Sequence, residues 1–502
     1  MIVKTKAISI GKFLSLIAFI IESSSSLPSN EQQPRILSFD LSPTAELSAP
    51  SGFHRNLKEW NYKHAIYGAL EYFASEKHSL KEDFDEAREF SRYEWHERHL
   101  QAELGVANEN TNVNLKRHLS KNNSPYQITP LFQGYGTHYA SVWVGTPPQR
   151  KSVIVDTGSH YTAFPCVGCK NCGEEHHTDP YFDPSKSSTF HTVACNECEA
   201  ATCGDEGKCV FSQSYTEGSS WSAYQAVDNF FCGSSNLPHD AVDNSFAIRF
   251  MFGCQTSETG LFVTQLADGI MGMSAHVATL PKKMVEAKKL DHNLFTLCFK
   301  RELSVSKEGV TAGILTLGGV DTRLNSSPMV YAKNMANVGW YTVNVKNIFL
   351  RKGGGVSAKL NKKKDEIIHI PMNAKSVNSG KGVIVDSGTT DTYLSRTLQK
   401  AFYQAWKAMT GMSYSNSALK ISLEEIRKLP TLLIQLEAFD GMGNKELMSM
   451  EQQGGSSIVG LVGSLDVTSP RDVLIAVPAE SFFEYSPSRD TFTSRLYFTE
   501  NR

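Results

Sequence analysis

The stretch Val153-Ile154-Val155-Asp156-Thr157-Gly158-Ser159 recurs, with two conservative changes, as Val383-Ile384-Val385-Asp386-Ser387-Gly388-Thr389. Each copy begins with three β-branched apolar residues, which predict a buried strand. The glycine two residues after each aspartate allows the chain to turn sharply there. We therefore expect Asp156 and Asp386, which are 230 residues apart, to lie at the ends of two buried strands in separate lobes, with their carboxylates meeting between the lobes.

Two carboxylates that share one small site have a specific chemical use. Like charges so close together cannot both form easily, so the pair holds one proton. The ionised aspartate can take a proton from a water molecule between them, while the protonated one donates to the carbonyl oxygen under attack. This is general acid–base hydrolysis of a peptide bond, and it needs neither a metal nor an organic cofactor. One Asp-Thr-Gly is a weak signal, but two copies with the same Val-Ile-Val lead-in indicate a function.

The two motifs resemble those of the pepsin-type aspartic peptidases, and the resemblance extends over most of the chain from about Leu131 onward. The cysteine-rich block after the first motif is similar to the branch that contains nepenthesins and plasmepsin V. The resemblance implies an all-β, bilobal pepsin-like fold with the active-site cleft between the two lobes. It also implies an aspartic endopeptidase that acts on proteins or peptides as a monomer, with Asp156 and Asp386 as its catalytic dyad.

The resemblance also assigns supporting roles. The residues after each aspartate would make the turns, donate hydrogen bonds to the carboxylates and brace the two loops: Thr157, Gly158, Ser159, Ser387, Gly388 and Thr389. Tyr215, in the strand–turn–strand pattern of residues 213–220, matches the tyrosine of the flap, a hairpin that closes over substrate. Residues 268–273 resemble the family's apolar-apolar-glycine element, which crosses behind the first aspartate loop and supports it.

Residues 1–26 are expected to be a secretory signal peptide. Lysines precede the apolar run Phe13–Ile21, which is too short to span a bilayer comfortably. An uncleaved anchor is the alternative, and no later stretch has the apolar length of a membrane span. The net charge of −2 gives no argument for a nucleic-acid partner. The chain is therefore expected in the secretory pathway: outside the cell, in a vacuole or lysosome, or in an endomembrane lumen.

Residues 27–126 are expected to be a partly helical pro-segment of a zymogen. Trp60, His64, Tyr67 and Glu71 recur at helical spacing, and a polar loop with the dibasic pair Lys116-Arg117 precedes the predicted folded part. A helical extension that is never removed is the alternative. The N-terminal lobe is expected over residues 127–330 and the C-terminal lobe over residues 331–502.

Nine of the ten cysteines lie between Cys166 and Cys254. Their spacing, with His176-His177 nearby, would suggest zinc in a cytosolic protein, but behind a signal peptide it favours disulfides and no metal. All ten are disulfide candidates: Cys166, Cys169, Cys172, Cys195, Cys198, Cys203, Cys209, Cys232, Cys254 and Cys298. The pairing cannot be read from the sequence. If the first nine form four pairs, one is left to meet Cys298; otherwise Cys298 had a partner beyond Arg502.

Several elements can be placed from local patterns. Residues 141–144 and 152–155 are predicted to form an antiparallel pair around the turn at residues 145–149, and residues 281–289 and 398–409 are predicted to be helical.

The C-terminal lobe departs from the family pattern. No second apolar-apolar-glycine element follows residues 482–498, and Ile458-Val459-Gly460 comes before the strands that should precede it. The lobe therefore looks truncated, which also leaves any membrane anchor after Arg502 out of sight. A catalytically impaired, secreted binding protein of the same fold is the alternative function.

Overall fold

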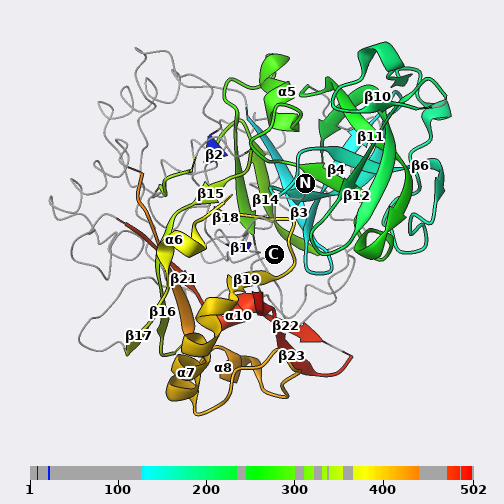
Figure 1. Cartoon of the computed structure of the whole chain (residues 1–502). Helices are drawn as coiled ribbons and strands as arrows, with labels where there is room; N and C mark the ends of the chain where they lie inside the picture. Colours follow the sequence, from blue (N-terminus) through cyan, green and yellow to red (C-terminus); the bar gives the residue numbers. More distant parts are fainter. Residues whose placement is uncertain are drawn as a thin grey trace, which may run out of the picture.

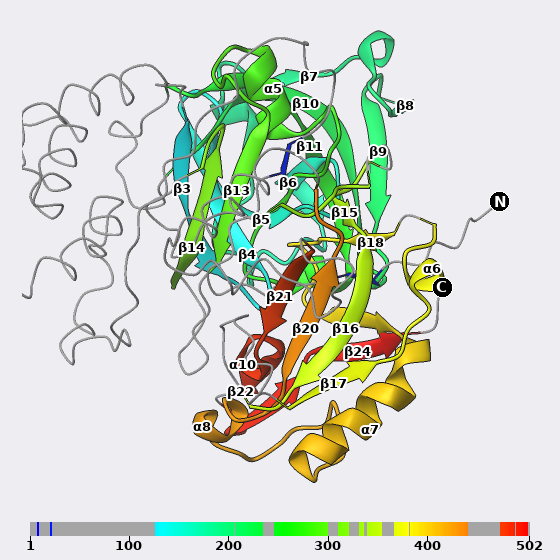
Figure 2. The same cartoon turned by 90° about the vertical axis from the view of Figure 1, so that its left-hand side faces the viewer.

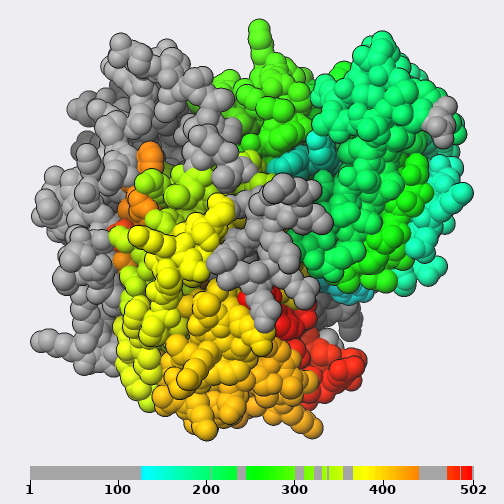
Figure 3. All heavy atoms as spheres, viewed as in Figure 1, coloured from blue at the N-terminus to red at the C-terminus, as the bar shows by residue number. Residues whose placement is uncertain are grey.

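The computed structural model describes residues 8–9, 21–22, 126–204, 206–233, 245–299, 310–320, 331–335, 339–353, 366–380, 382–439, 472–486 and 488–499. The expected signal peptide and pro-segment lie outside these residues, except for β1 (Ile8–Ser9), β2 (Ile21–Glu22) and Tyr126. Residues 458–460 lie outside them as well. Apart from β1 and β2, the described residues form two groups, residues 126–320 in cyan and green and residues from 331 onward in yellow-green to red (Figure 1). Figure 3 shows the same division on the molecular surface.

The first group, called the N-terminal lobe below, is built on one large sheet. Its strands are β3 (Gln127–Gln133), β4 (His138–Val144), β5 (Gln149–Asp156), β6 (Thr162–Lys170), β7 (His191–Thr192), β8 (Thr202–Cys203), β9 (Cys209–Ser214), β10 (Ser220–Cys232), β11 (Ile248–Thr259), β12 (Gly269–Gly272), β13 (Leu294–Phe299) and β14 (Thr311–Leu317). With β2 they make a 13-stranded sheet in the order β2-β13-β14-β3-β4-β5-β12-β6-β11-β10-β9-β8, and β7 pairs with β10. Its helices are α5 (Leu280–Glu286) and the 3₁₀ turns η2 (Pro184–Lys186), η3 (Cys195–Glu197) and η5 (Gly260–Val263).

The second group, the C-terminal lobe, contains smaller sheets. Its strands are β15 (Thr342–Val343), β16 (Val345–Arg351), β17 (Ile367–Ile370), β18 (Val383–Ile384), β19 (Thr392–Ser395), β20 (Thr431–Leu436), β21 (Val473–Val477), β22 (Phe483–Ser486), β23 (Thr491–Ser494) and β24 (Leu496–Thr499). The pairing orders are β1-β18-β15, β17-β16-β20-β21, β19-β24 and β22-β23. Its helices are α6 (Ala374–Val377), η7 (Arg396–Leu398), α7 (Gln399–Thr410), α8 (Leu423–Ile426) and α10 (Ala479–Phe482).

The hairpin of β4 and β5 brings Asp156 to its place. The predicted antiparallel pair is confirmed, with Tyr139 opposite Ile154 and Val144 opposite Gln149. The apolar residues of β5 are buried because further layers cover both faces of the strand, so a continuous Val-Ile-Val run suits this position better than alternation does. As a result, Asp156 lies at the end of a strand that the core holds on both sides.

Each lobe has its own hydrophobic core. In the N-terminal lobe, buried residues such as Phe164, Phe252 and Met271 form one cluster, and a second cluster around Trp221 and Phe262 lies toward the flap hairpin. The C-terminal core is formed around α7 and β20. Two separate cores explain how a chain of this length buries enough apolar surface, and they leave the motif loops at the junction.

The predicted helix at residues 398–409 is confirmed as α7. Phe402, Ala405, Trp406 and Met409 are buried at helical spacing, and Gly411, with φ of +74°, ends the helix in the left-handed conformation. Figure 2 shows α7 at the end of the C-terminal lobe that faces away from the N-terminal lobe. The predicted helix at residues 281–289 is shorter, since α5 ends at Glu286. Among the described residues, no helix is both long and apolar enough to cross a membrane.

Candidate active site

The two repeated motifs meet at the junction of the lobes. Asp156 ends β5 and Asp386 follows β18. A Cβ atom added at Gly158 would lie 2.6 Å from Oδ2 of Asp386, and one added at Gly388 would lie 2.2 Å from Oδ1 of Asp156. Each glycine therefore touches the carboxylate of the other motif, and no side chain fits there. This close approach places the two carboxyl groups in one site.

A symmetric set of four hydrogen bonds joins the two loops. The backbone N–H of Thr157 donates to Oγ of Ser387 at 3.1 Å, and the N–H of Ser387 donates to Oγ1 of Thr157 at 2.9 Å. The same two hydroxyls donate to the carbonyl oxygens that precede the opposite aspartate, Val385 at 2.8 Å and Val155 at 2.6 Å. Each hydroxyl thus donates its hydrogen and accepts an N–H across the junction, so the loops hold each other in register.

Asp156 is buried, with 4% of its surface exposed, and its carboxyl group is held on both oxygens. Oδ1 accepts the N–H of Gly158 at 2.9 Å, and Oδ2 accepts the hydroxyl of Ser159. Burial first, and then the neighbouring charge of Asp386, raises the pKa of Asp156 well above its usual range, while the Ser159 and Gly158 hydrogen bonds oppose this. The pair is therefore set up to hold a proton at a pH where isolated carboxyl groups are ionised.

Asp386 has the same arrangement in a more open position. Its Oδ1 accepts the N–H of Gly388 at 2.8 Å and that of Thr389 at 3.2 Å, and its Oδ2 accepts the Thr389 hydroxyl. Asp386 is only partly buried, whereas Asp156 is buried. The two carboxyl groups thus have matching donors but unequal burial.

A strand that crosses behind the first loop supports it, as expected for residues 268–273. β12 runs parallel to β5 with Gly272 opposite Asp156, and the N–H of Met273 donates to the carbonyl of Asp156 at 2.7 Å. A Cβ atom at Gly272 would lie 2.4 Å from the backbone of His160, so only glycine fits.

The corresponding position in the C-terminal lobe holds an unexpected strand. β1 runs parallel to β18, with Ile8 opposite Val383 and Ser9 opposite Ile384, which is the same relation that β12 has to β5. Sequence analysis assigned these residues to the signal peptide and found no second supporting element. Ile10-Gly11 has the second apolar residue and the glycine of such an element, but Ser9 stands at the first apolar position, so the sequence signal is weak.

The expected flap is a hairpin of β9 and β10. Its turn is closed by the N–H of Tyr215, which donates to the carbonyl of Ser219 at 2.9 Å. Nε1 of Trp221 donates to the hydroxyl of Tyr215 at 3.2 Å. Burial, followed by the carboxylate of Asp156, raises the pKa of Tyr215, so the tyrosine lies near the aspartate pair and stays protonated. Sequence reasoning missed Trp221, whose signal is its place on the returning strand of the hairpin.

The chain is similar in sequence to known proteins. Residues 138–319 match the family described as "Xylanase inhibitor N-terminal". Aspartic protease 5 of Toxoplasma gondii is 34% identical over 215 residues, which are 39% of this chain and 20% of that protein. Aspartic proteinase nepenthesin-2 of Nepenthes gracilis is 27% identical over 285 residues, 55% of this chain and 57% of that protein. Plasmepsin V of Plasmodium falciparum is 32% identical over 151 residues, 30% of this chain and 24% of that protein.

The chain is thus similar to pepsin-type aspartic peptidases of the nepenthesin and plasmepsin V branch. Its matched segments span less than three fifths of the length of each of these three relatives. Its fold is all-β and pepsin-like, as the sequence predicted.

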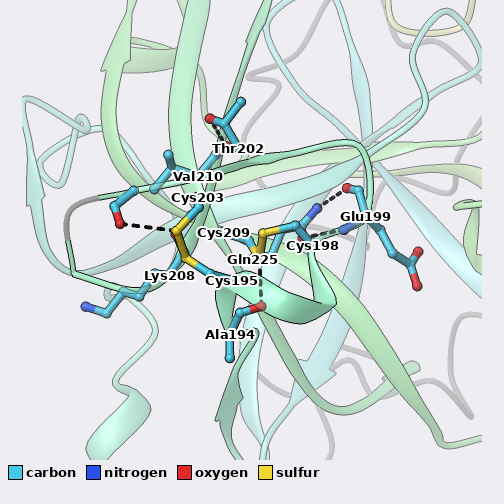
Figure 4. The surroundings of a disulfide bond; sticks show 11 residues. Ala194, Cys195, Cys198, Glu199, Thr202, Cys203, Lys208, Cys209, Val210 and Gln225 are labelled. Carbon is cyan, nitrogen blue, oxygen red and sulfur yellow. Dashed lines mark hydrogen bonds between the residues drawn. A yellow bond between two sulfur atoms is a disulfide. The ribbon is translucent and has the colours of Figure 1, made fainter.

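In this pepsin-type chain, the cysteine-rich block is held by four disulfides: Cys166–Cys254, Cys169–Cys172, Cys195–Cys203 and Cys198–Cys209. Figure 4 shows the last two, which close short loops beside β9 and β10. The buried amide of Gln225 exchanges two hydrogen bonds with the backbone of Glu199 and so ties this block to β10. Disulfides of this kind fit an oxidising compartment.

Eight of the ten disulfide candidates form these four bonds. Cys232 and Cys298 are not part of the four disulfides. Cys232 is buried at the end of β10, and burial raises the pKa of its thiol to about 12. Within the part of the chain that the structure describes, no three His, Cys, Asp or Glu side chains come together as metal ligands would.

Aromatic rings that sequence reasoning missed flank the Asp156 loop. Nε1 of Trp340 donates to the carbonyl of Gly158 at 2.8 Å. The ring of His160 lies 5.2 Å from that of Trp340 and stacks on His276 at 4.6 Å, while its Nδ1 contacts Oγ of Ser274 at 2.5 Å. Trp340 thus links the start of the C-terminal lobe to the first aspartate loop. The only sequence signal for it was an aromatic pair before a strand.

Proposed function

We propose that the chain is an aspartic endopeptidase that hydrolyses peptide bonds of protein substrates, with Asp156 and Asp386 as the catalytic dyad. The observation that carries the proposal is the reciprocal contact in which each motif glycine abuts the carboxylate of the other motif. This contact puts two carboxyl groups, with matching hydrogen-bond donors, within reach of one water molecule. The relatives' names, which describe aspartic proteinases, support the same activity.

The unequal burial of the two carboxyl groups suggests how the proton is shared. The raised pKa of Asp156 favours the acid form on that side, which leaves the more exposed Asp386 to act as the base. The base removes a proton from water as the water oxygen bonds to the scissile carbonyl carbon, and the acid protonates the carbonyl oxygen. Proton transfer to the amide nitrogen then allows the carbon–nitrogen bond to break, which returns one proton to the dyad.

The lobes proposed for this enzyme run over residues 127–330 and 331–502, and residues 1–26 and 27–126 remain a proposed signal peptide and pro-segment. Ser159 and Thr389 would orient the carboxyl groups, while Thr157, Gly158, Ser387 and Gly388 maintain the loops. Tyr215 would cover the bound substrate. The four disulfides support passage through the secretory pathway.

The test is cleavage of an unfolded protein, such as casein, by the purified full chain at mildly acidic pH, followed by mass spectrometry of the products. Asp156→Asn and Asp386→Asn should each lower the rate by about 10³-fold or more, because acid–base catalysis requires both carboxyl groups. Asp291→Asn, which makes the same change at an exposed turn, should leave the rate unchanged. Equal rates in the wild type and both dyad variants would overturn the proposal.

A binding protein is the second candidate, because the matching family is described as a xylanase inhibitor. Against it, both aspartates and Tyr215 are present with the geometry given above. A folded wild type that cleaves nothing in the same assay would favour this candidate.

A further inference from the structure

A buried histidine and a buried glutamate face each other beneath the flap, outside the dyad. The side chains of His177 and Glu258 have no exposed surface, and Nε2 of His177 lies 4.0 Å from Oε2 of Glu258. The same Nε2 lies 3.0 Å from the carbonyl oxygen of Phe262, to which it can donate. Nδ1 of His177 and both carboxyl oxygens of Glu258 have no hydrogen-bond partner.

Burial favours an uncharged state of this pair. An ionised carboxylate without donors is costly in a dry site, so the pair is best held as a protonated carboxyl group and a neutral imidazole. Burial, aided by the charge of Asp268, raises the pKa of Glu258 to about 9. Burial also lowers the pKa of His177; the Phe262 carbonyl opposes this, and His176 and Lys151 add to it. The titratable groups that act on the pair from neighbouring elements are Lys151, His176, Tyr181 and Asp268.

Two short routes connect the pair to Tyr215 in the flap. On the first route, the carbonyl oxygen of Phe262 faces His177, and the ring of Phe262 lies 5.1 Å from the ring of Tyr215. On the second, Glu258 lies directly opposite Trp221 in the β10–β11 ladder, and Trp221 donates to the Tyr215 hydroxyl. Opposite residues of an antiparallel pair share one face of the sheet.

The pair also joins the cysteine-rich block to η5, which forms the floor beneath the flap. His177 belongs to the loop after Cys169–Cys172, and this loop packs closely on η5. A Cβ atom at Gly173 would lie 2.1 Å from the carbonyl oxygen of Val263. η5 in turn contacts the flap, since the N–H of Leu261 donates to Oγ of Ser219 at 2.9 Å. Any hydration of the buried pair would therefore separate the loop from the floor of the flap.

We propose that His177 and Glu258 form a proton-dependent latch between the cysteine-rich loop and the floor of the flap, and so act as positioning residues for Tyr215. Only the expected effect of the latch on substrate cleavage rests on the proposed function. The latch itself is a conformational equilibrium that can be measured without substrate.

The pH range in which the latch holds follows from proton counting. The closed pair carries one proton, on Glu258. When the pair opens to water, its groups return to their usual pKa values, 4.5 for glutamate and 6.5 for histidine. Between these values the open pair also carries one proton, so opening is independent of pH. Above 6.5 opening releases a proton, and the open population rises by up to about tenfold per pH unit until Glu258 ionises; below 4.5 opening takes up a proton and is again favoured.

The experiment follows Trp221 in the full chain by ¹⁹F NMR after incorporation of 5-fluorotryptophan. The background is Asp386→Asn, which prevents self-digestion, and Trp221→Phe assigns the resonance. We expect a resonance that is constant from about pH 4.5 to 6.5 and that shifts toward a second state above pH 6.5. A resonance independent of pH from 4.5 to 9 would overturn the latch, whatever the outcome of the cleavage assay.

Two variants should change in opposite ways the pH at which the latch begins to open. His177→Gln keeps a donor at the Nε2 position but cannot be protonated, so opening should release a proton from about pH 4.5 upward, two units earlier than in the parent. Glu258→Gln imitates the protonated carboxyl group, so the latch should stay closed above pH 6.5 and loosen only below it. A purely structural role would not shift the onset in opposite directions.

Matched controls separate the latch from its surroundings. His176→Gln changes the adjacent histidine, whose side chain is 44% exposed, and should leave the onset unchanged. Asp268→Asn tests whether the pH-dependent transition comes from the nearby carboxyl group of Asp268 and not from Glu258. If Asp268→Asn abolishes the transition and Glu258→Gln does not, the proposal is wrong. Should a variant fail to fold, ¹³Cε1 shifts of the histidines in the parent chain still decide: the pKa of His177 should lie below the usual 6.5 of histidine, and ordinary titration near 6.5 would contradict the latch.

Discussion

The hydroxyl oxygen of Ser387 accepts the backbone N–H of Thr157, and the hydroxyl oxygen of Thr157 accepts the backbone N–H of Ser387. The two residues are 230 positions apart, and each lies directly after a dyad aspartate. Neither aspartate loop therefore has a complete set of hydrogen bonds within its own lobe.

Replacing one member of this brace should affect both loops. Ser387→Ala leaves the N–H of Thr157 without an acceptor in a buried site, which should lower the free energy of unfolding by about 1–3 kcal/mol. The double variant Thr157→Ala/Ser387→Ala should lose less than the sum of the single changes, with a coupling of about 0.5–3 kcal/mol. Chemical denaturation of the four proteins measures this coupling. Strict additivity would mean that the two residues do not act as a unit.

Removing the hydroxyl of Ser159 should change the pH profile of cleavage. Its hydrogen bond favours the ionised form of Asp156 and so lowers a pKa that burial and Asp386 raise. In Ser159→Ala that pKa rises further, so the dyad keeps its proton to higher pH. The alkaline limb of kcat/KM should therefore move to higher pH, while kcat falls. Ser185→Ala, at an exposed turn, is the control, and a limb that moves toward acid would contradict the assignment.

The hydrogen bond from Trp221 to Tyr215 should matter for the flap. Trp221→Phe keeps most of the buried aromatic surface and removes only the Nε1–H donor. A loss of about 1 kcal/mol, or roughly fivefold, is expected in kcat/KM. Steady-state kinetics on a peptide substrate measures it, with the melting temperature as a check on stability. A drop in melting temperature with unchanged kcat/KM would show that the bond serves the fold and not the flap.

Cys232 should resist alkylation in the native protein. It is buried, and the raised pKa of its thiol keeps the reactive thiolate scarce at neutral pH. After denaturation without reductant, iodoacetamide should modify Cys232, which peptide mass spectrometry detects. Recovery of Cys232 in a disulfide-linked peptide would contradict the pairing described above.

The parts of the fold that depend on neighbouring residues could be predicted from the sequence. The pair of β4 and β5 and the helix α7 follow from local apolar patterns and turn residues, whereas the course of β12 behind the Asp156 loop was implied by the resemblance to pepsin-type peptidases. The cysteine-rich block was recognisable as a disulfide framework from its cysteine spacing behind a predicted signal peptide, although its pairing was not.

The contacts that sequence reasoning missed join distant segments. Trp340 reaches Gly158 across 182 positions, and His177 and Glu258 are brought together only by the fold of the cysteine-rich loop over η5. No periodicity marks such pairs, because each residue is ordinary in its own neighbourhood. The parallel pairing of β1 with β18 was missed because a short apolar run after lysines also has the composition of a leader.

The disulfides Cys195–Cys203 and Cys198–Cys209 both begin and end within a stretch of fifteen residues. Both disulfides therefore close loops within this stretch, although Cys203 and Cys209 belong to β8 and β9 of the sheet, and Gln225 ties the stretch to β10. Such a segment can be exchanged as a cassette: mutations inside it, or a graft from a relative, alter the outer surface without disturbing the strands that carry the aspartates.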